Sequence, residues 1–412
     1  MMPESKRPTG VSEARPAIGA ETPGSEPGIV GLRVALVIGN KGIGGAERQC
    51  LLLANELERL GAVVKIYFQD RPFRYRHTET LDFSRFRTRH LYCGPFSRLG
   101  FVGRRLNRLY FAWVLRAARV QVVHCFNLDY TFTLFGLEAA KAAGIKAVVG
   151  GVRNMAFVHH AGFQQRLREA SKLCVGMTCN SQGGAGRLTG QGIIAPERLW
   201  VIENGIEVPS AESGRAGRLQ REPQVLFAGN LKAVKDPLCF VESALRVLGA
   251  GRQCKFVIAG DGDLRGQVQA AVRAAGALAS FELLGLVRPE AVPYAQARVL
   301  VSTSLSEGSS NSILEALAHG TPVVATAVGA ASEALEGQPF ATLVKPQDPA
   351  SVSAAIDYWL KLSRSEWEAA STSARKYVRD HFSVSKMAAR HCAFYRWAIG
   401  VANSSTRTPG SS

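Results

Sequence analysis

Short apolar runs, separated by stretches with helical periodicity, recur along this chain and restrict its fold more than any other feature. Most of the runs are apolar throughout rather than alternating, as in LRVALVIG and VQVVHCF. Continuous apolar runs are typical of parallel strands that are buried on both faces of a sheet. Because strand-like and helix-like segments alternate, we expect an open, doubly wound α/β sheet. The first set of runs comprises residues 32–39, 63–68, 120–126, 146–152, 175–180 and 199–204.

The pattern starts again after a polar linker that contains Gly and Pro, PSAESGRAGRLQREP. The second set comprises residues 223–230, 254–261, 281–285, 297–304, 321–326 and 340–345. Two sets predict two Rossmann-like domains that face each other across a central cleft. The predicted limits are 1–30 (disordered tail), 31–208 (N-terminal domain), 209–222 (linker), 223–383 (C-terminal domain), 384–402 (terminal helix packing back across the domain seam) and 403–412 (disordered tail).

The composition favours a cytoplasmic protein. No apolar run approaches the roughly 20 residues needed to span a bilayer. The N-terminus has no apolar core of the kind that a secretory signal carries. The 8 cysteines are scattered without a CxxC pair. Reduced and mostly buried thiols are therefore favoured over disulfides or a metal site.

Positive charge is concentrated in one segment. The chain has 50 basic and 33 acidic residues, a net charge of +17, and residues 71–119 contain twelve Arg against two acids, a local charge of +10. Aromatic residues such as Phe96, Phe101 and Trp113 are interleaved with these arginines. Such a segment suits anionic lipid, nucleic acid or an anionic substrate; the alternative is a solvated basic face with its aromatics in the core. Because no nucleic-acid motif is present, we expect peripheral contact with the anionic inner face of the plasma membrane and no nucleic-acid partner.

Loops that follow the strands are the candidate sites, because ligands of open α/β sheets bind beyond the carboxyl ends of the strands. The loop GNKGIGGAERQ is rich in Gly, including Gly45, and a helix is expected to begin near Ala46. A turn of this kind offers free N–H groups and the positive end of a helix dipole to an anion. Its spacing is not G-x-G-x-x-G, so a dinucleotide cofactor is not favoured.

Two loops of the second set carry charged residues. In AGNLKAVKDP, Lys232 and Lys235 lie ahead of a helix that is expected to begin near Pro237. Their ammonium groups suit a diphosphate, although two solvated lysines are the alternative. In AGDGDLR, Asp261 is expected to cap the helix that follows.

The most informative stretch is EGSSNSILEALAHGTPVVAT, residues 307–326. Glu307 lies in the turn after a strand, a helix is expected from about Asn311 to Ala318, and Glu315 lies one turn into that helix. A carboxylate at 315 suits the vicinal hydroxyls of a ribose, and a carboxylate at 307 suits those of a second sugar. The helix N-terminus between them suits phosphate. The stretch therefore suits a ligand that has a nucleoside at one end and a sugar at the other.

These motifs resemble a known family. EGSSNSILEALAHGTPVVAT resembles the E-x7-E signature of the large retaining nucleotide-sugar glycosyltransferase family called group 1, or family 4, which has the GT-B fold. The segments GIGGAE, NSQGGAGRL, VIENGIEV, FAGNLKAVKDP, IAGDGDLR and FELLGLV follow in the order of the family. The resemblance covers residues 31 to about 400 and implies an acceptor-side domain followed by a donor domain.

The resemblance also implies roles for single residues. Lys235 would bind the donor diphosphate, Glu307 would contact the donor sugar, and Glu315 would hold the ribose. Asn230 stands where the family often has Arg, so Lys232 is expected to supply the charge, and the V-G-G-x-x-E element is weakened to VGAASE. The implied donor-binding residues are Gly45, Asn230, Lys232, Lys235, Asp261, Val287, Glu307, Gly308, Ser309, Ser310, Asn311 and Glu315.

The first-domain residue that assists the acceptor is open between two candidates. His124 lies near the end of the run 120–126, and Arg153, followed by Asn154, comes directly after the run 146–152. A lone His at a strand end is more often structural, whereas a cation is useful in the cleft. We therefore rank Arg153 ahead of His124 and group it with Lys235 and Glu307 as catalytic.

The predicted reaction moves a sugar from a nucleoside diphosphate to a hydroxyl of a glycan or lipid-linked acceptor, in cell-envelope or exopolysaccharide assembly, with retention of anomeric configuration. The resemblance implies a hexosyltransferase that needs no metal and no cofactor. Two alternatives stay open: a catalytically silent nucleotide-binding protein at the membrane, and a sugar-nucleotide epimerase of the same fold. The intact E-x7-E signature argues against the epimerase, and the intact Glu307, Glu315 and Lys235 argue against the silent protein.

Overall fold

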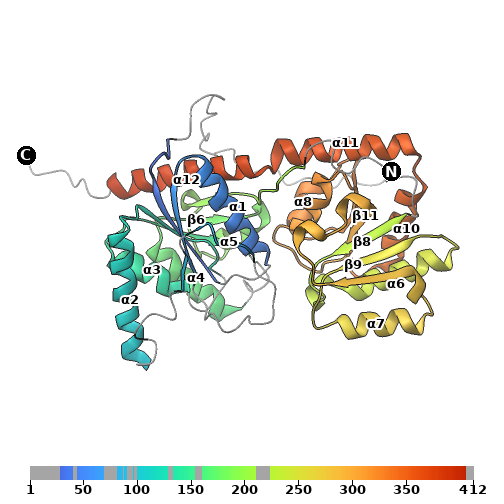
Figure 1. The fold of residues 1–412 in the computed structure, drawn as a ribbon, viewed down its shortest axis with the longest axis horizontal. Coiled ribbons are helices and arrows are strands. Elements are labelled where there is room, and N and C mark those ends of the chain that lie inside the picture. The colour runs from blue at the N-terminus through green and yellow to red at the C-terminus, as the bar shows by residue number, and fades with distance from the viewer. Residues whose placement is uncertain are drawn as a thin grey trace, which may run out of the picture.

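The structure, a computed structural model, describes residues 28–39, 44–68, 81–86, 88–90, 96, 100–128, 133–153, 160–209 and 223–404. These residues form two parallel sheets that lie side by side, each covered by helices (Figure 1). The two sheets follow one another in the sequence, as the two sets of apolar runs predict.

The first sheet has seven strands in the order β3-β2-β1-β4-β5-β6-β7, and every pair is parallel. Alternate residues of β1 enter different cores: Ala35 and Val37 lie on one face of the sheet, and Leu36 and Ile38 lie on the other. The strands are β1 (Arg33–Ile38), β2 (Val63–Phe68), β3 (Thr88–His90), β4 (Val122–Cys125), β5 (Ala147–Val152), β6 (Gly176–Cys179) and β7 (Leu199–Val201). The helices are α1 (Gly45–Arg59), α2 (Gly100–Ala117), α3 (Thr133–Ala142), α4 (Ala161–Leu173) and α5 (Gln182–Gly190).

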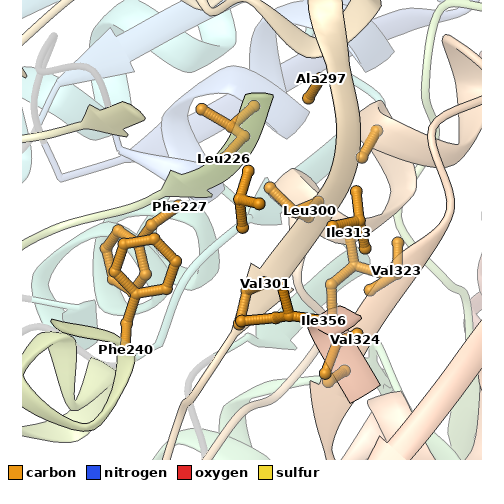
Figure 2. Close-up of a cluster of buried hydrophobic side chains, with 14 of the residues drawn as sticks. Leu226, Phe227, Phe240, Ala297, Leu300, Val301, Ile313, Val323, Val324 and Ile356 are labelled. Atoms are coloured by element: carbon orange, nitrogen blue, oxygen red, sulfur yellow. The ribbon is translucent and has the colours of Figure 1, made fainter. Parts of the chain in front are cut away.

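The second sheet has six strands in the order β10-β9-β8-β11-β12-β13, again all parallel. Figure 2 shows its core, where the rings of Phe227 and Phe240 lie 5.3 Å apart and Leu300 and Val324 are fully buried. The strands are β8 (Gln224–Ala228), β9 (Lys255–Ala259), β10 (Phe281–Gly285), β11 (Ala297–Ser302), β12 (Val323–Thr326) and β13 (Ala341–Val344). The helices are α6 (Pro237–Gly249), α7 (Arg265–Ala274), α8 (Asn311–Ala318), α9 (Ala330–Leu335), α10 (Pro349–Lys361) and α11 (Arg364–His381).

The last helix returns to the first half of the chain. After α11, a bridge between Ile206 and Ser383 marks the crossing, and α12 (Val384–Ser404) packs against α1 and β5 (Figure 1). Phe394 and Tyr395 of α12 are fully buried in the core beneath the first sheet. The predicted return of the terminal helix across the seam is therefore confirmed.

Each predicted apolar run contains a strand of the structure, whereas β3 was not predicted. Its sequence, Thr-Arg-His, holds no apolar residue, so it carries no hydrophobic signal. The predicted tails and linker fall largely outside the described residues, and the domain limits stay predictions.

Seven cysteines lie among the described residues, and all seven are buried and free of disulfides. The expected burial of the thiols is found for these residues, while Cys93 lies outside them. Over the part of the chain that the structure describes, no helix is both long enough and apolar enough to cross a membrane.

Candidate functional site

A cavity of about 560 Å³ lies between the two halves of the chain. The first half contributes the start of α1 and loops that follow β4, β5, β6 and β7, and the second half contributes loops after β8 to β11 together with α8. Carboxyl ends of both parallel sheets thus open onto one space, where ligands of such sheets bind. The predicted residues on its wall are Gly45, Arg153, Asn230, Lys232, Lys235, Val287, Glu307, Ser309, Ser310, Asn311 and Glu315.

Lys235 is held at the cavity by a short turn. It ends the 3-10 turn Ala233–Lys235, and Asp236 follows in the left-handed conformation with φ of 44° and caps α6 by accepting from the N–H of Cys239 at 3.2 Å. The buried hydroxyl of Thr303 donates to the carbonyl oxygens of Lys235 and Asp236, at 3.1 and 2.8 Å. The end of β11 therefore fixes the backbone that carries the Lys235 ammonium group.

Glu307 forms an ion pair with Lys235 on the cavity wall. The hydroxyl of Ser304 donates to the same carboxylate oxygen at 2.9 Å. Gly329, with φ of 53°, lies against the backbone of Glu307, and a Cβ at this position would come within 1.9 Å of the Glu307 carbonyl oxygen. This close approach admits only glycine and fixes the loop that presents Glu307.

The N-terminus of α8 faces the cavity through Ser310, Asn311 and Ser312. The side chain of Ser310, the N-cap residue, makes no capping hydrogen bond, and the first turn of α8 contains no acidic residue. The amide N–H groups and the positive end of the helix dipole therefore favour an anion at this place.

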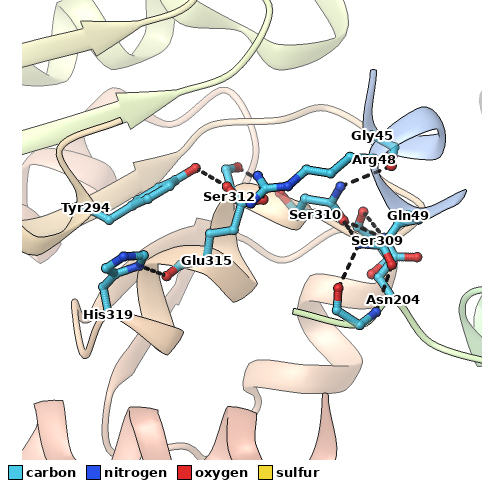
Figure 3. Close-up of polar contacts among 12 residues, drawn as sticks. Gly45, Arg48, Gln49, Asn204, Tyr294, Ser309, Ser310, Ser312, Glu315 and His319 are labelled. Carbon is cyan, nitrogen blue, oxygen red and sulfur yellow. Dashed lines mark hydrogen bonds and ion pairs between the residues drawn. The ribbon is translucent and has the colours of Figure 1, made fainter. Parts of the chain in front are cut away.

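Glu315 lies one turn further along α8 and is contacted from both halves of the chain (Figure 3). Arg48 of α1 forms an ion pair with Oε1, and the hydroxyl of Tyr294 donates to Oε2 at 2.7 Å. Burial raises the pKa of the Glu315 carboxyl, and the Arg48 guanidinium and the Tyr294 hydrogen bond offset part of that rise. Burial, followed by the Glu315 charge, raises the pKa of Tyr294 well above its usual value, so the phenol stays a donor.

Asn311 joins the two halves next to the Arg48–Glu315 pair. Its Oδ1 accepts from Asn204 Nδ2 at 2.7 Å and from Gln49 Nε2 at 3.3 Å, and its Nδ2 donates to the Gly45 carbonyl at 3.3 Å. Gln49 also exchanges hydrogen bonds with the backbone of Gly205, at 2.8 and 2.9 Å. These amides hold the start of α1 against the start of α8.

Arg153 reaches the cavity, whereas His124 does not. Arg153 Nη1 donates to Asn204 Oδ1 at 2.8 Å, and the guanidinium carbon lies 3.9 Å from the centre of the Phe126 ring. His124 is fully buried, its Nδ1 lies 2.8 Å from the hydroxyl of Tyr395 on α12, and it is absent from the cavity wall. Of the two candidates for assisting the acceptor, His124 is a core residue; Asn154 lies outside the described residues.

Comparison with known families identifies the chain. A family model described as "Glycosyl transferases group 1" matches residues 222–361, and one described as "Glycosyltransferase Family 4" matches residues 43–208. The chain belongs to this glycosyltransferase family. An uncharacterized glycosyltransferase of Methanocaldococcus jannaschii is 29% identical over 183 residues, which make up 43% of this chain and 46% of the relative. The chain thus spans about half the length of this curated relative.

Solved structures show that the family member has the GT-B fold. A glycosyltransferase from Rickettsia africae matches with a TM-score of 0.72 and 17% identity, over 89% of this chain and 98% of the other. The HepE protein of Anabaena, solved in complex with UDP and glucose, matches with a TM-score of 0.69 and 20% identity, over 87% of this chain and 97% of the other.

Two of the predicted donor residues lie off the cavity wall. Asp261 accepts from the N–H of Gly262 and from Arg265 Nη1, both at 2.7 Å. The prediction that Asp261 caps α7 is wrong, because α7 begins at Arg265 with Leu264 as its uncapped N-cap residue. Gly308 lies behind the wall, where an added Cβ would come within 2.9 Å of the Arg153 carbonyl oxygen, so it lets the two halves approach.

The cavity side chains that were not predicted from the sequence include Arg48, Gln49, Asn204 and Tyr294. Arg48 and Gln49 directly follow the recognised GIGGAE segment, and Asn204 lies within VIENGIEV, so both segments marked their region. Tyr294 begins a 3-10 turn, Tyr294–Gln296, directly before β11, and it lies in none of the recognised motifs. Among the described residues, no group of three or more His, Cys, Asp or Glu is arranged to hold a metal ion.

Proposed function

We propose that this family member transfers a sugar from a nucleoside diphosphate sugar to an acceptor hydroxyl, with retention of the anomeric configuration. The observation that carries the proposal is the presence of Glu307 and Glu315 on one cavity, on either side of the uncapped N-terminus of α8. A nucleotide sugar has hydroxyl groups at both ends and a diphosphate between them. Carboxylates accept hydrogen bonds from hydroxyls, and helix N–H groups bind phosphate. The order of these groups along the cavity therefore matches the order of hydroxyls and diphosphate along a nucleotide sugar.

The diphosphate would lie against Lys235, Lys232 and the start of α8. Lys232 lies on the cavity wall and is exposed, which suits a ligand phosphate. As the bond to the sugar breaks, negative charge collects on the leaving diphosphate, and fixed positive groups stabilise that charge. We assign this role to the two lysines and the helix terminus, so the proposed reaction uses no metal ion.

The nucleoside would occupy the other end of the cavity. Leu286, Val287 and Val292 give this end apolar wall for a base, and Glu315 lies beside it for the ribose hydroxyls. Gly45 leaves space at the start of α1, where a Cβ would come within 3.3 Å of Asn311 Nδ2. The small residue therefore lets the start of α1 lie close to the start of α8.

Retention would follow from attack on the face that the diphosphate leaves. The acceptor oxygen forms the new bond to the anomeric carbon, the bond to the phosphate oxygen breaks, and the acceptor proton passes to the leaving phosphate. Glu307 would hold hydroxyls of the transferred sugar, and Arg153 would place positive charge on the acceptor side.

A thermal-shift screen tests donor binding. The probes are UDP, GDP, ADP and CDP, with UDP first because the Anabaena neighbour was solved with it. A ligand that binds only the folded state raises Tm. The matching nucleotide sugars are then incubated with the protein, and released nucleoside diphosphate is measured. Binding without release would favour a silent nucleotide-binding protein, and interconversion of two sugar nucleotides would favour an epimerase.

We also propose that the enzyme works at an anionic membrane on a lipid-linked or glycan acceptor. Helix α2, on the outer side of the first half (Figure 1), exposes Val102, Leu109 and Trp113 at 61%, 58% and 63%. Their spacing of seven and four residues places them on one face of the helix. Arg104 and Arg105 are also exposed, and α2 contains no acidic residue. An apolar face beside arginines suits the interface of an anionic bilayer; residues 71–80, 87, 91–95 and 97–99 of the basic segment lie outside the described residues.

A further inference from the structure

Glu315 is shared between the two halves of the molecule. Arg48 from α1 binds its Oε1, and Tyr294, from the stretch before β11, binds its Oε2. The Arg48 and Glu315 side chains are 19% and 7% exposed, so the ion pair is largely withdrawn from water. Figure 3 shows Arg48 extending from the blue helix of the first half to Glu315 and Tyr294 of the second.

Among the residues that the structure describes, each oxygen of the Glu315 carboxylate therefore receives one hydrogen bond. An ionised carboxylate offers about four lone-pair positions, two on each oxygen. One acceptor position is left on each oxygen, which matches the number and spacing of the two vicinal hydroxyls of a ribose. The two protein donors also prevent the carboxylate from rotating.

We propose that Arg48 is a positioning residue for the nucleotide ribose: it holds Glu315 ionised and oriented, and it does so from the opposite domain. This inference rests on the proposed function, because it takes Glu315 as the ribose contact. A consequence of this role is that the donor site of the second half is incomplete until α1 lies against α8.

The neighbouring contacts support this role. Gln49, next to Arg48 on α1, binds Asn311, which lies four residues before Glu315 on α8. Two adjacent residues of one helix thus engage two residues one turn apart on the other. Removing the Arg48 guanidinium would leave Glu315 with the Tyr294 hydroxyl as its one donor among the described residues, and a buried carboxylate with less compensation favours its neutral form.

Ribose binding is therefore coupled to the contact between α1 and α8. If contact between α1 and α8 strengthens the hold on ribose, ribose must strengthen that contact by the same factor, because coupling between two binding events is reciprocal. The donor nucleotide would then favour the arrangement in which Arg153 of the first half lies at the cavity. Arg48 would thereby link donor occupancy to readiness for the acceptor.

The test measures the affinities of the full chain for UDP and for 2′,3′-dideoxy-UDP, which lacks both ribose hydroxyls, by calorimetry. If the thermal-shift screen selects GDP, then GDP and its dideoxy form take their place. Arg48→Met keeps the apolar stem of the side chain and removes the charge. We expect it to weaken UDP binding at least tenfold and dideoxy-UDP binding less than twofold. Arg59→Met, at an exposed position of the same helix, is the matched control and should change neither affinity.

The double variant Arg48→Met/Glu315→Gln should bind UDP no more weakly than Glu315→Gln alone, because both changes remove the same contact. Thermal unfolding without ligand verifies that each variant is folded. A loss of UDP affinity in Glu315→Gln but not in Arg48→Met would overturn the inference and leave the proposed function standing. An equal loss for both nucleotides in Arg48→Met would also overturn it. Failure of the wild-type protein to bind UDP, GDP, ADP or CDP would remove the proposed function and the inference together.

Discussion

Lys235 and Glu307 lie 72 positions apart in the sequence and form an ion pair on the wall of the interdomain cavity. Their side chains are 25% and 10% exposed. Both side chains line the cavity that the start of α8 also lines. A cation fixed in this way needs little reorganisation when negative charge develops nearby.

Lys235→Ala tests that role. If the ammonium group stabilises the leaving diphosphate, its contact is stronger in the transition state than in the ground state, and kcat falls more than KM rises. We expect a loss of about 100-fold in kcat, as for removal of one fixed donor at a charge-developing oxygen. Steady-state kinetics with varied donor measures both constants. Lys361→Ala, an exposed lysine of α10, is the control, and an unchanged kcat with a raised KM would make Lys235 a ground-state binder.

Glu315→Gln tests the ribose contact. The change keeps the size of the side chain and replaces one anionic acceptor oxygen by an NH2 group. We expect donor affinity to fall by about 1.5–3 kcal/mol, which is tenfold or more. Calorimetry with the free nucleoside diphosphate measures the loss. Unchanged affinity would show that Glu315 does not bind the ribose.

Tyr294→Phe isolates the second donor to Glu315. The phenol is 3% exposed and donates to Oε2 at 2.7 Å, so its loss leaves the ring packing intact and removes one hydrogen bond. We expect nucleotide affinity to fall by about 1 kcal/mol, roughly fivefold, with little change in Tm. The same calorimetric titration applies. A large fall in Tm with normal affinity would point to a purely structural role for the hydroxyl.

The fold was predictable because its signal is local. Strands buried on both faces, such as β5, must be apolar along their whole length, and the runs in the sequence report that directly. The helix from Asn311 to Ala318 was predicted at its observed limits, since the preceding turn is rich in Gly and Ser. β3 was missed because an edge strand of three polar residues has no such signal.

The partners of the site residues were not predictable, because they depend on packing between distant elements. Arg48 and Glu315 are 267 positions apart, and their pairing requires two domains to meet at one orientation. The place of His124 also depends on packing between distant elements. Its position near a strand end suited a cleft residue, yet α12 covers that face and encloses it with Tyr395.

Two buried histidines should make the fold sensitive to acid. Burial lowers the pKa of His391 from its usual value to about 3, and burial, followed by the neighbouring His391, lowers the pKa of His124 well below its usual value. Both rings are neutral in the folded chain and take up protons near pH 6.5 when the chain unfolds. The unfolded state therefore binds more protons between about pH 3 and 6.5, and the free energy of unfolding falls as pH drops through that range.

Urea unfolding at pH 7 and pH 5 measures this effect. Each neutral buried histidine contributes up to about 1.4 kcal/mol for each pH unit below 6.5. His391→Asn keeps an N–H donor for the Met387 carbonyl, which lies 2.9 Å from Nδ1, and removes the titrating ring. The variant should lose less stability than the wild type between the two pH values. His381→Asn, at an exposed position, is the control, and equal losses in wild type and His391→Asn would contradict the assignment.

The exposed face of α2 predicts salt-reversible binding to anionic membranes. Each arginine near an anionic surface contributes about 1 kcal/mol, and salt screens this over a Debye length of roughly 8–10 Å. Trp113 is the one tryptophan among the large exposed apolar residues of the described chain, so lipid with brominated acyl chains should quench its fluorescence selectively. The fraction of protein that sediments with phosphatidylglycerol vesicles should fall at high salt. It should also be lower with vesicles of phosphatidylcholine alone. Trp113→Ser and Arg104→Ser/Arg105→Ser should each weaken it about tenfold, whereas Tyr358→Ser, a 54% exposed aromatic of the second half, should not. Protein that stays in the supernatant at low salt would favour a soluble acceptor and a basic face that is merely solvated.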